Sequence, residues 1–199
     1  MKIKTIVSAI LLAGAFSGQA YAVDAETTLE KHYQYLGLGI DRVSTDDVDY
    51  SVNALSLRLG ALLNKNLYYA VELESMEDDM GEDNITISSL KADIGARYQY
   101  SDLGDVYVSA GWDASLVDVL GGEQDEVTDV NLEFGSHYAL VEHFILGANL
   151  AYVVPEGADN HFAYGLDATV FIGERFSYTM GFTSGDGYDS YGLDISLHF

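Results

Sequence analysis

The residues best suited to chemistry in this 199-residue chain are clustered carboxylates. Three acidic clusters, over residues 46–49, 77–83 and 123–129, contain no Lys or Arg. Hard oxygen ligands suit calcium or magnesium, so loop-bound divalent cations are one interpretation. The candidate ligands are Asp46, Asp47, Asp49, Glu77, Asp78 and Asp79. The spacing matches no EF-hand loop, and a solvated, soluble surface is the alternative. Apart from such ions we expect no cofactor.

A second kind of chemistry, acyl or peptide hydrolysis, needs a serine, a histidine and an acid in contact. His161, Ser184 and Ser190 open or close neighbouring segments, with Asp159 and Asp186 nearby. Ser and Asp are also ordinary loop residues, and no local motif marks these as catalytic. A hydrolase at this rim stays an alternative, but we assign no catalytic residue and expect the protein not to be an enzyme.

The composition excludes several classes of protein. The chain has 32 Asp and Glu against 9 Lys and Arg, a net charge of -23, which argues against binding nucleic acid. The absence of Cys excludes a disulfide scaffold, a thiolate metal site and a cysteine nucleophile. With 48% apolar and 12% aromatic residues, the chain is too hydrophobic to be disordered.

The first 22 residues predict a secretory signal peptide. Lys2 and Lys4 supply the positive start, residues 6–16 a short apolar stretch, and residues 20–22 (Ala-Tyr-Ala) a cleavage site. The apolar stretch is shorter than the roughly 20 residues that span a bilayer. We therefore expect residues 23–199 to be exported as one domain.

Most of the chain after residue 33 alternates between apolar and polar residues, which indicates strands with two different faces. The expected strands are 33–42, 50–63, 67–76, 86–100, 105–117, 127–140, 143–154, 161–172, 175–184 and 190–199. Tight turns follow every second strand, and most other connections are longer and acidic. An even number of strands with this arrangement predicts an all-β, antiparallel, up-and-down transmembrane barrel of ten strands, with eight as the alternative. No helical periodicity is evident.

The polar face of these strands is expected to line the lumen. It carries ten of the 20 glycines, which a solvent-facing strand would not need but a crowded interior would. We expect the missing side chains to leave room for long ones from opposite strands. A network of ionised residues shares this face: Arg58, Glu72, Glu74, Lys91, Asp93, Arg97, Asp113, Glu133, Asp167 and Asp194. His137 and His198 share it too, as structural histidines. The other face is apolar, with aromatic residues near both ends, as in a barrel that faces lipid.

The lumen residues bear on whether the barrel is filled by side chains or conducts ions. A barrel of eight strands is just wide enough to be filled by side chains, and ten strands are close to that size. We therefore expect a polar, side-chain-filled lumen held by ion pairs, and a structural or surface-interaction role. Because acids outnumber bases on the lumen face, a narrow, cation-preferring, porin-like channel is the alternative.

The last ten residues resemble the assembly signal of outer-membrane proteins. The run SYGLDISLHF contains Gly192, the alternating Ile195 and Leu197, and a terminal Phe199. With the signal peptide and the hairpins, the chain is similar to the small bacterial outer-membrane barrels of the OmpX, Ail and OmpA-transmembrane type. This resemblance implies insertion by the barrel assembly machinery and contact with lipid and lipopolysaccharide. It also implies termini in the periplasm and acidic loops outside; we expect a monomer.

Overall fold

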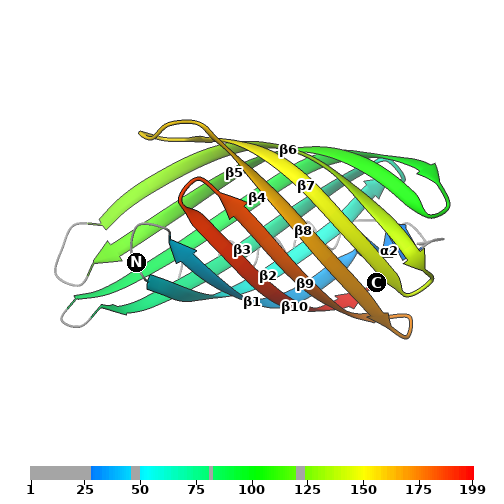
Figure 1. Ribbon diagram of the computed structural model, residues 1–199, viewed down its shortest axis with the longest axis horizontal. Helices are drawn as coiled ribbons and strands as arrows, with labels where there is room; N and C mark the ends of the chain where they lie inside the picture. Colours follow the sequence, from blue (N-terminus) through cyan, green and yellow to red (C-terminus); the bar gives the residue numbers. More distant parts are fainter. Residues whose placement is uncertain (1–27, 46–49, 81–82, 120–123) are drawn as a thin grey trace.

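The described residues, 28–45, 50–80, 83–119 and 124–199 of a computed structural model, form a closed antiparallel barrel of ten strands (Figure 1). A short helix, α2 (Thr28–His32), precedes the barrel. The strands are β1 (Tyr35–Thr45), β2 (Tyr50–Asn64), β3 (Leu67–Met80), β4 (Asp83–Ser101), β5 (Gly104–Val119), β6 (Gln124–Val141), β7 (Phe144–Pro155), β8 (His161–Ile172), β9 (Phe176–Gly185) and β10 (Tyr188–His198). The predicted up-and-down barrel is confirmed, with ten strands rather than eight.

Pairing between the first and last strands closes the sheet. β1 and β10 pair along their whole length, from Tyr35 opposite His198 to Thr45 opposite Tyr188. Each other strand pairs with its neighbours in the sequence. The connections after β2, β4, β6 and β8 are tight turns at one end of the barrel, which we call the turn end; α2 and the C-terminus also lie there (Figure 1). The opposite end is the loop end.

The sequence prediction was wrong about two connections and one helix. The described residues of the expected acidic connections between strands 67–76 and 86–100 and between strands 105–117 and 127–140 are strand, because β3 pairs with β4 as far as Met80 opposite Asp83, and β5 pairs with β6 as far as Asp118 opposite Gln124. Acidic residues disfavour strands on average, but here a paired neighbour supplies the backbone hydrogen bonds. The helix α2 has only five residues, too few to show a period.

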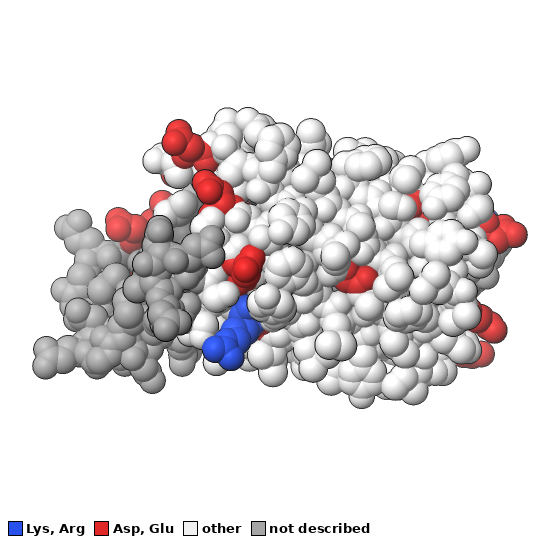
Figure 2. Space-filling model, in the orientation of Figure 1, with Lys and Arg blue, Asp and Glu red and all other residues white. Residues whose placement is uncertain are grey.

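The outer surface of the barrel is apolar. Leu38, Ile40, Met180, Leu193 and Ile195 are between 49% and 67% exposed, as are many other outward side chains. Figure 2 shows few charged residues in the band between the two ends on the side in view. A soluble protein rarely exposes so large an apolar area. This apolar outer surface, which we call the apolar belt, therefore requires an apolar environment. Among the described residues, no helix is long and apolar enough to cross a membrane.

Glycines on the inner face make room for side chains of the adjacent strand. A Cβ added to Gly95 would lie 2.3 Å from the ring of Tyr68, which is directly opposite on β3. Tyr35 lies over Gly60 in the same way, and a Tyr side chain of β5 lies over the glycine opposite it on β6. The expectation that the vacated space serves opposite strands was therefore wrong. The space is used by the hydrogen-bonded neighbour, whose side chain lies flat along the wall.

We expect Gly95→Ala to destabilise the folded barrel by about 1–3 kcal/mol, because the new methyl group would displace the Tyr68 ring. Gly181→Ala is the matched control, since a Cβ at this lumen glycine has nothing within 4 Å. The measurement is the urea dependence of unfolding of both variants in lipid vesicles. Equal stability of the two variants would contradict the steric role of Gly95.

Candidate functional site

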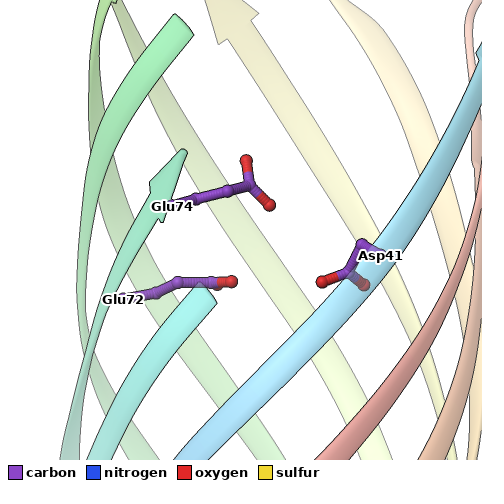
Figure 3. A group of neighbouring side chains, drawn as sticks. All are labelled: Asp41, Glu72 and Glu74. Carbon is purple, nitrogen blue, oxygen red and sulfur yellow. The ribbon is translucent and has the colours of Figure 1, made fainter. Parts of the chain in front are cut away.

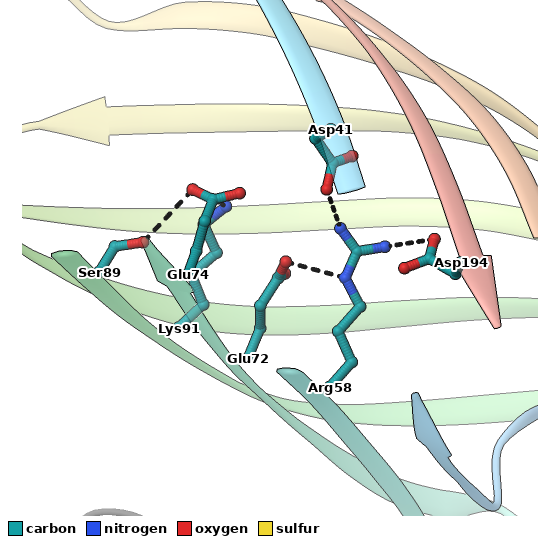
Figure 4. Close-up of polar contacts among 7 residues, drawn as sticks. All are labelled: Asp41, Arg58, Glu72, Glu74, Ser89, Lys91 and Asp194. Carbon is teal, nitrogen blue, oxygen red and sulfur yellow. Dashed lines mark hydrogen bonds and ion pairs between the residues drawn. The ribbon is translucent and has the colours of Figure 1, made fainter. Parts of the chain in front are cut away.

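A cluster of charged side chains lies on one wall of the lumen. The guanidinium of Arg58 on β2 contacts three carboxylates from three other strands (Figure 4). Its Nη2 lies 2.9 Å from Asp41 Oδ2, its Nε 2.8 Å from Glu72 Oε1, and its Nη1 2.6 Å from Asp194 Oδ2. The side chain is only 24% exposed, so these contacts are partly shielded from water. We call Asp41, Arg58, Glu72, Glu74, Lys91 and Asp194 the central charge cluster.

Three carboxylates of this cluster approach one another closely enough to bind a cation. Ligand atoms of Asp41, Glu72 and Glu74 all lie within 4.8 Å of one another, and the three side chains point into the same space from β1 and β3 (Figure 3). Arg58 already bonds Asp41 and Glu72, and the Lys91 ammonium lies 3.9 Å from Glu74 Oε1. The positive charge that this group needs is therefore supplied by the protein itself.

The other residues of the expected lumen network are distributed along the barrel. Arg97 lies towards the turn end, where its Nε is 3.0 Å from Asp105 Oδ2 and both side chains are buried. Asp105 was not among the predicted lumen residues, although it shares the face of Asp113 on β5. Four predicted acids, Asp93, Asp113, Glu133 and Asp167, form no ion pair within 4 Å among the described residues.

Residues 28–34 fold into the turn end of the lumen, and we call them the plug. The side chain of Leu29 is 0% exposed and packs in a cluster with Ala139, Ile145 and Phe171. All three partners project inward from β6, β7 and β8. Full burial of a leucine side chain is worth about 1.5–3 kcal/mol, so this contact anchors the plug inside the barrel.

Polar contacts tie the plug to a second region of the wall. The hydroxyl of Tyr33 lies 3.1 Å from Nδ1 of His137 on β6, and that nitrogen lies 3.2 Å from Asp105 Oδ1 on β5. The guanidinium of Arg97 on β4 lies over the Tyr33 ring, 4.8 Å from its centre. Burial is the main cause that raises the pKa of the Tyr33 hydroxyl far above its usual value, followed by the negative charge of Asp105. Tyr33 is therefore a neutral hydrogen-bonding group.

The plug also contacts the far side of the barrel. The Nδ1–H of His198 on β10 donates to the carbonyl oxygens of Lys31 (2.8 Å) and Gln34 (3.1 Å), while its Nε2 accepts from the Ser177 hydroxyl (2.8 Å). β10 and β6 are separated by β7, β8 and β9 on one side of the ring and by β1–β5 on the other. Residues 28–34 therefore bridge the lumen from wall to wall.

A half-buried histidine, His32, lies in the plug. The ring centres of His32 and His137 are 4.4 Å apart. Burial, more than any other cause, holds the pKa of His32 well below its usual value of 6.5, and electrostatic interactions with His137, His198 and Arg97 lower it further. His32 is therefore neutral while the plug is seated.

The remaining sequence candidates do not assemble into a second site. The hydrogen bond of His161 goes to the Asp159 carbonyl oxygen, at 3.5 Å, within its own turn. Strand alternation directs Ser184 outward beside Phe182, whereas His161 follows the lumen positions of β8. Among the described residues, no hydrogen bond joins His161 to Ser184 or Ser190.

The acidic candidates cannot be placed as ligands. Asp46, Asp47 and Asp49 lie outside the described residues, as do the side chains of Glu77, Asp78 and Asp79.

Comparison with solved structures identifies the fold. The NanC porin matches with a TM-score of 0.56 and 6% identity, covering 82% of this chain and 100% of that chain. The β domain of the Bordetella autotransporter BrkA matches with a TM-score of 0.53 and 9% identity, covering 83% and 98%. Ail of Yersinia pestis matches at a TM-score of 0.41, with 11% identity over 83% of this chain and 95% of Ail. No protein-family profile and no curated protein sequence matches the chain. The fold is that of outer-membrane β-barrels.

We expect Arg58→Met to lower the stability of the barrel by about 3 kcal/mol, since breaking a buried ion pair leaves carboxylates without a partner. This is the lower end of the usual range, because a quarter of the Arg58 side chain stays accessible. Arg42→Met is the control: Arg42 is exposed, and its guanidinium contacts only the Ser51 hydroxyl among the described residues. The unfolding free energies of both variants provide the measurement. A loss no larger than that of the control would show that the central charge cluster contributes little.

Proposed function

We propose that the chain is an integral barrel of the bacterial outer membrane with a structural or surface-interaction role, and that its lumen does not conduct while the plug is in place. The apolar belt supports the membrane location, because a charged side chain on the lipid face of such a barrel costs about 2–4 kcal/mol at the midplane. The outward strand positions carry almost no charge there. The resemblance in fold to the NanC porin and the BrkA β domain also supports this location.

The observation that carries the proposal of a closed lumen is the plug. Leu29 is buried among inward side chains of β6, β7 and β8, and the following residues reach β10 through the ring of His198. A path for hydrated ions along the axis would have to displace these packed groups. The lumen is therefore closed at the turn end by contacts of the plug, which are separate from the pairing of the strands.

The surface-interaction role is supported by the acidic connections at the loop end. In this orientation the turn end faces the periplasm, and the acidic connections face outward beside lipopolysaccharide. Ile195, Leu197 and Phe199 are exposed at the outer face of β10 and its end, where the barrel assembly machinery could read them. We also propose that the barrel is a monomer. Divalent cations would bridge its outer acidic residues to lipopolysaccharide phosphates.

A narrow, cation-preferring channel is the second candidate. It is favoured by the four lumen acids that form no ion pair among the described residues, since these would attract cations over anions. The NanC protein, whose fold is similar, is a porin. In this alternative the plug is a removable gate.

The first test is conductance in planar bilayers. We expect the wild-type protein to be silent and Leu29→Glu to give small, cation-selective currents, because a carboxylate cannot remain in the apolar cluster without a partner. Leu29→Met conserves volume and should stay silent. Steady ohmic current from the wild type would favour the channel, and silence of Leu29→Glu would show that other side chains close the lumen.

The second test is the pH dependence of closure. The pKa of His32 is lowered when the plug is seated, so the released plug binds a proton more readily. The stability of the seated plug is therefore greatest above about pH 6.5 and falls as the pH drops below that value. We expect openings to become more frequent on acidification, and His32→Gln to weaken this dependence. The control His161→Gln, at the loop end, should leave the pH dependence unchanged. An unaltered pH profile in His32→Gln would show that His32 does not cause the pH dependence.

A further inference from the structure

A cavity of about 190 Å³ lies in the lumen and borders the plug. Its wall includes plug residues and inward side chains of several strands. The residues that matter for recognition are Tyr33, Tyr35, Tyr68, Tyr107, Asp93 and Glu133. The cavity is thus built from aromatic rings and two carboxylates.

The aromatic rings form one continuous surface. The ring centres of Tyr33 and Tyr68 are 4.8 Å apart, and those of Tyr68 and Tyr107 are 6.2 Å apart, edge to face. Tyr107 stacks on His137 at 5.0 Å. Two of these tyrosines are fixed by the glycines on which they lie, Gly95 and Gly135. A ligand therefore meets rings whose positions are set before it binds.

The charge of this cavity is negative. None of its lining residues is Lys or Arg, and neither Asp93 nor Glu133 has an ion-pair partner within 4 Å among the described residues. The Tyr107 hydroxyl donates to Oε1 of Glu133, at 2.5 Å, which orients the carboxylate. His32 also lines the cavity, and its pKa lies below its usual value.

The protein already places a cation against this aromatic surface. The Arg97 guanidinium lies 4.8 Å from the centre of the Tyr33 ring, within the range of a cation–π interaction. Aromatic rings combined with a carboxylate are the usual means of recognising ammonium groups, because the ring face and the anion both favour positive charge.

We propose that this cavity binds a small organic cation, an ammonium compound of roughly seven non-hydrogen atoms. The size follows from comparison with an apolar cavity of about 150 Å³, which holds benzene. The ammonium group lies between Asp93 and Glu133, and its alkyl groups contact the tyrosine rings. Because Tyr33 of the plug lines the cavity, the site exists while the plug is seated, whether or not the plug can also act as a gate.

The test is titration of the folded wild-type protein with choline, followed by calorimetry and by NMR. The protein is held in a maltoside detergent, because phosphocholine detergents would compete. We expect saturable binding of choline, and at least about tenfold weaker binding of its neutral isostere, in which carbon replaces nitrogen. Equal binding of both compounds, or no saturable binding of choline, would overturn the proposal.

Variants locate the site within the lumen. Glu133→Gln and Asp93→Asn should each weaken choline binding by about tenfold, since each removes a charged partner. The matched controls are Asp113→Asn and Asp167→Asn, lumen acids that do not line the cavity; these should change binding by less than about twofold. Equal losses in all four variants would mean that the lumen charge attracts cations without a defined site, and would overturn the proposal. The comparison of choline with its isostere needs no variant and stands even if one fails to fold.

Discussion

Every strand of this barrel must satisfy the hydrogen bonds of its backbone. Inside a bilayer no water is available to an unpaired N–H or C=O group, and each such group costs several kcal/mol. Pairing of β1 with β10 along their whole length satisfies these groups and leaves no free edge. Closure then fixes the division of side chains into an outer set, which meets lipid, and an inner set, which must fill or line a narrow space.

Filling that space explains the inner residues. Glycine and tyrosine face each other on adjacent strands, so the ring lies along the wall and the lumen is lined without being overfilled. Arg58 neutralises carboxylates from three other strands, which could not otherwise be buried together. At the turn end, Leu29 of the plug completes an apolar cluster with Ala139, Ile145 and Phe171 of the strands.

The local alternation of apolar and polar residues was sufficient to predict the strands and their inward and outward faces. Alternation with period two identified ten strands and separated outward Leu193 and Ile195 from inward Arg58 and Asp194, because strand geometry repeats every two residues whatever the partner. The extents of β3 to β6 were underestimated, since pairing with a neighbour outweighed the low strand preference of acidic residues. The plug was missed, because five helical residues carry no detectable period and are held by contacts with distant strands.

The barrel, its apolar outer surface and the inward residues could be predicted from the sequence, since they follow from local periodicity and residue type. Which inward residues contact one another became clear only from the folded barrel. Arg97 pairs with Asp105 and lies over Tyr33, while Glu133 and Asp93 line an aromatic cavity with no ion-pair partner in the described part of the chain. These contacts depend on the register between strands and on the path of the chain into the lumen. Both are set by closure of the whole barrel, which no single segment encodes.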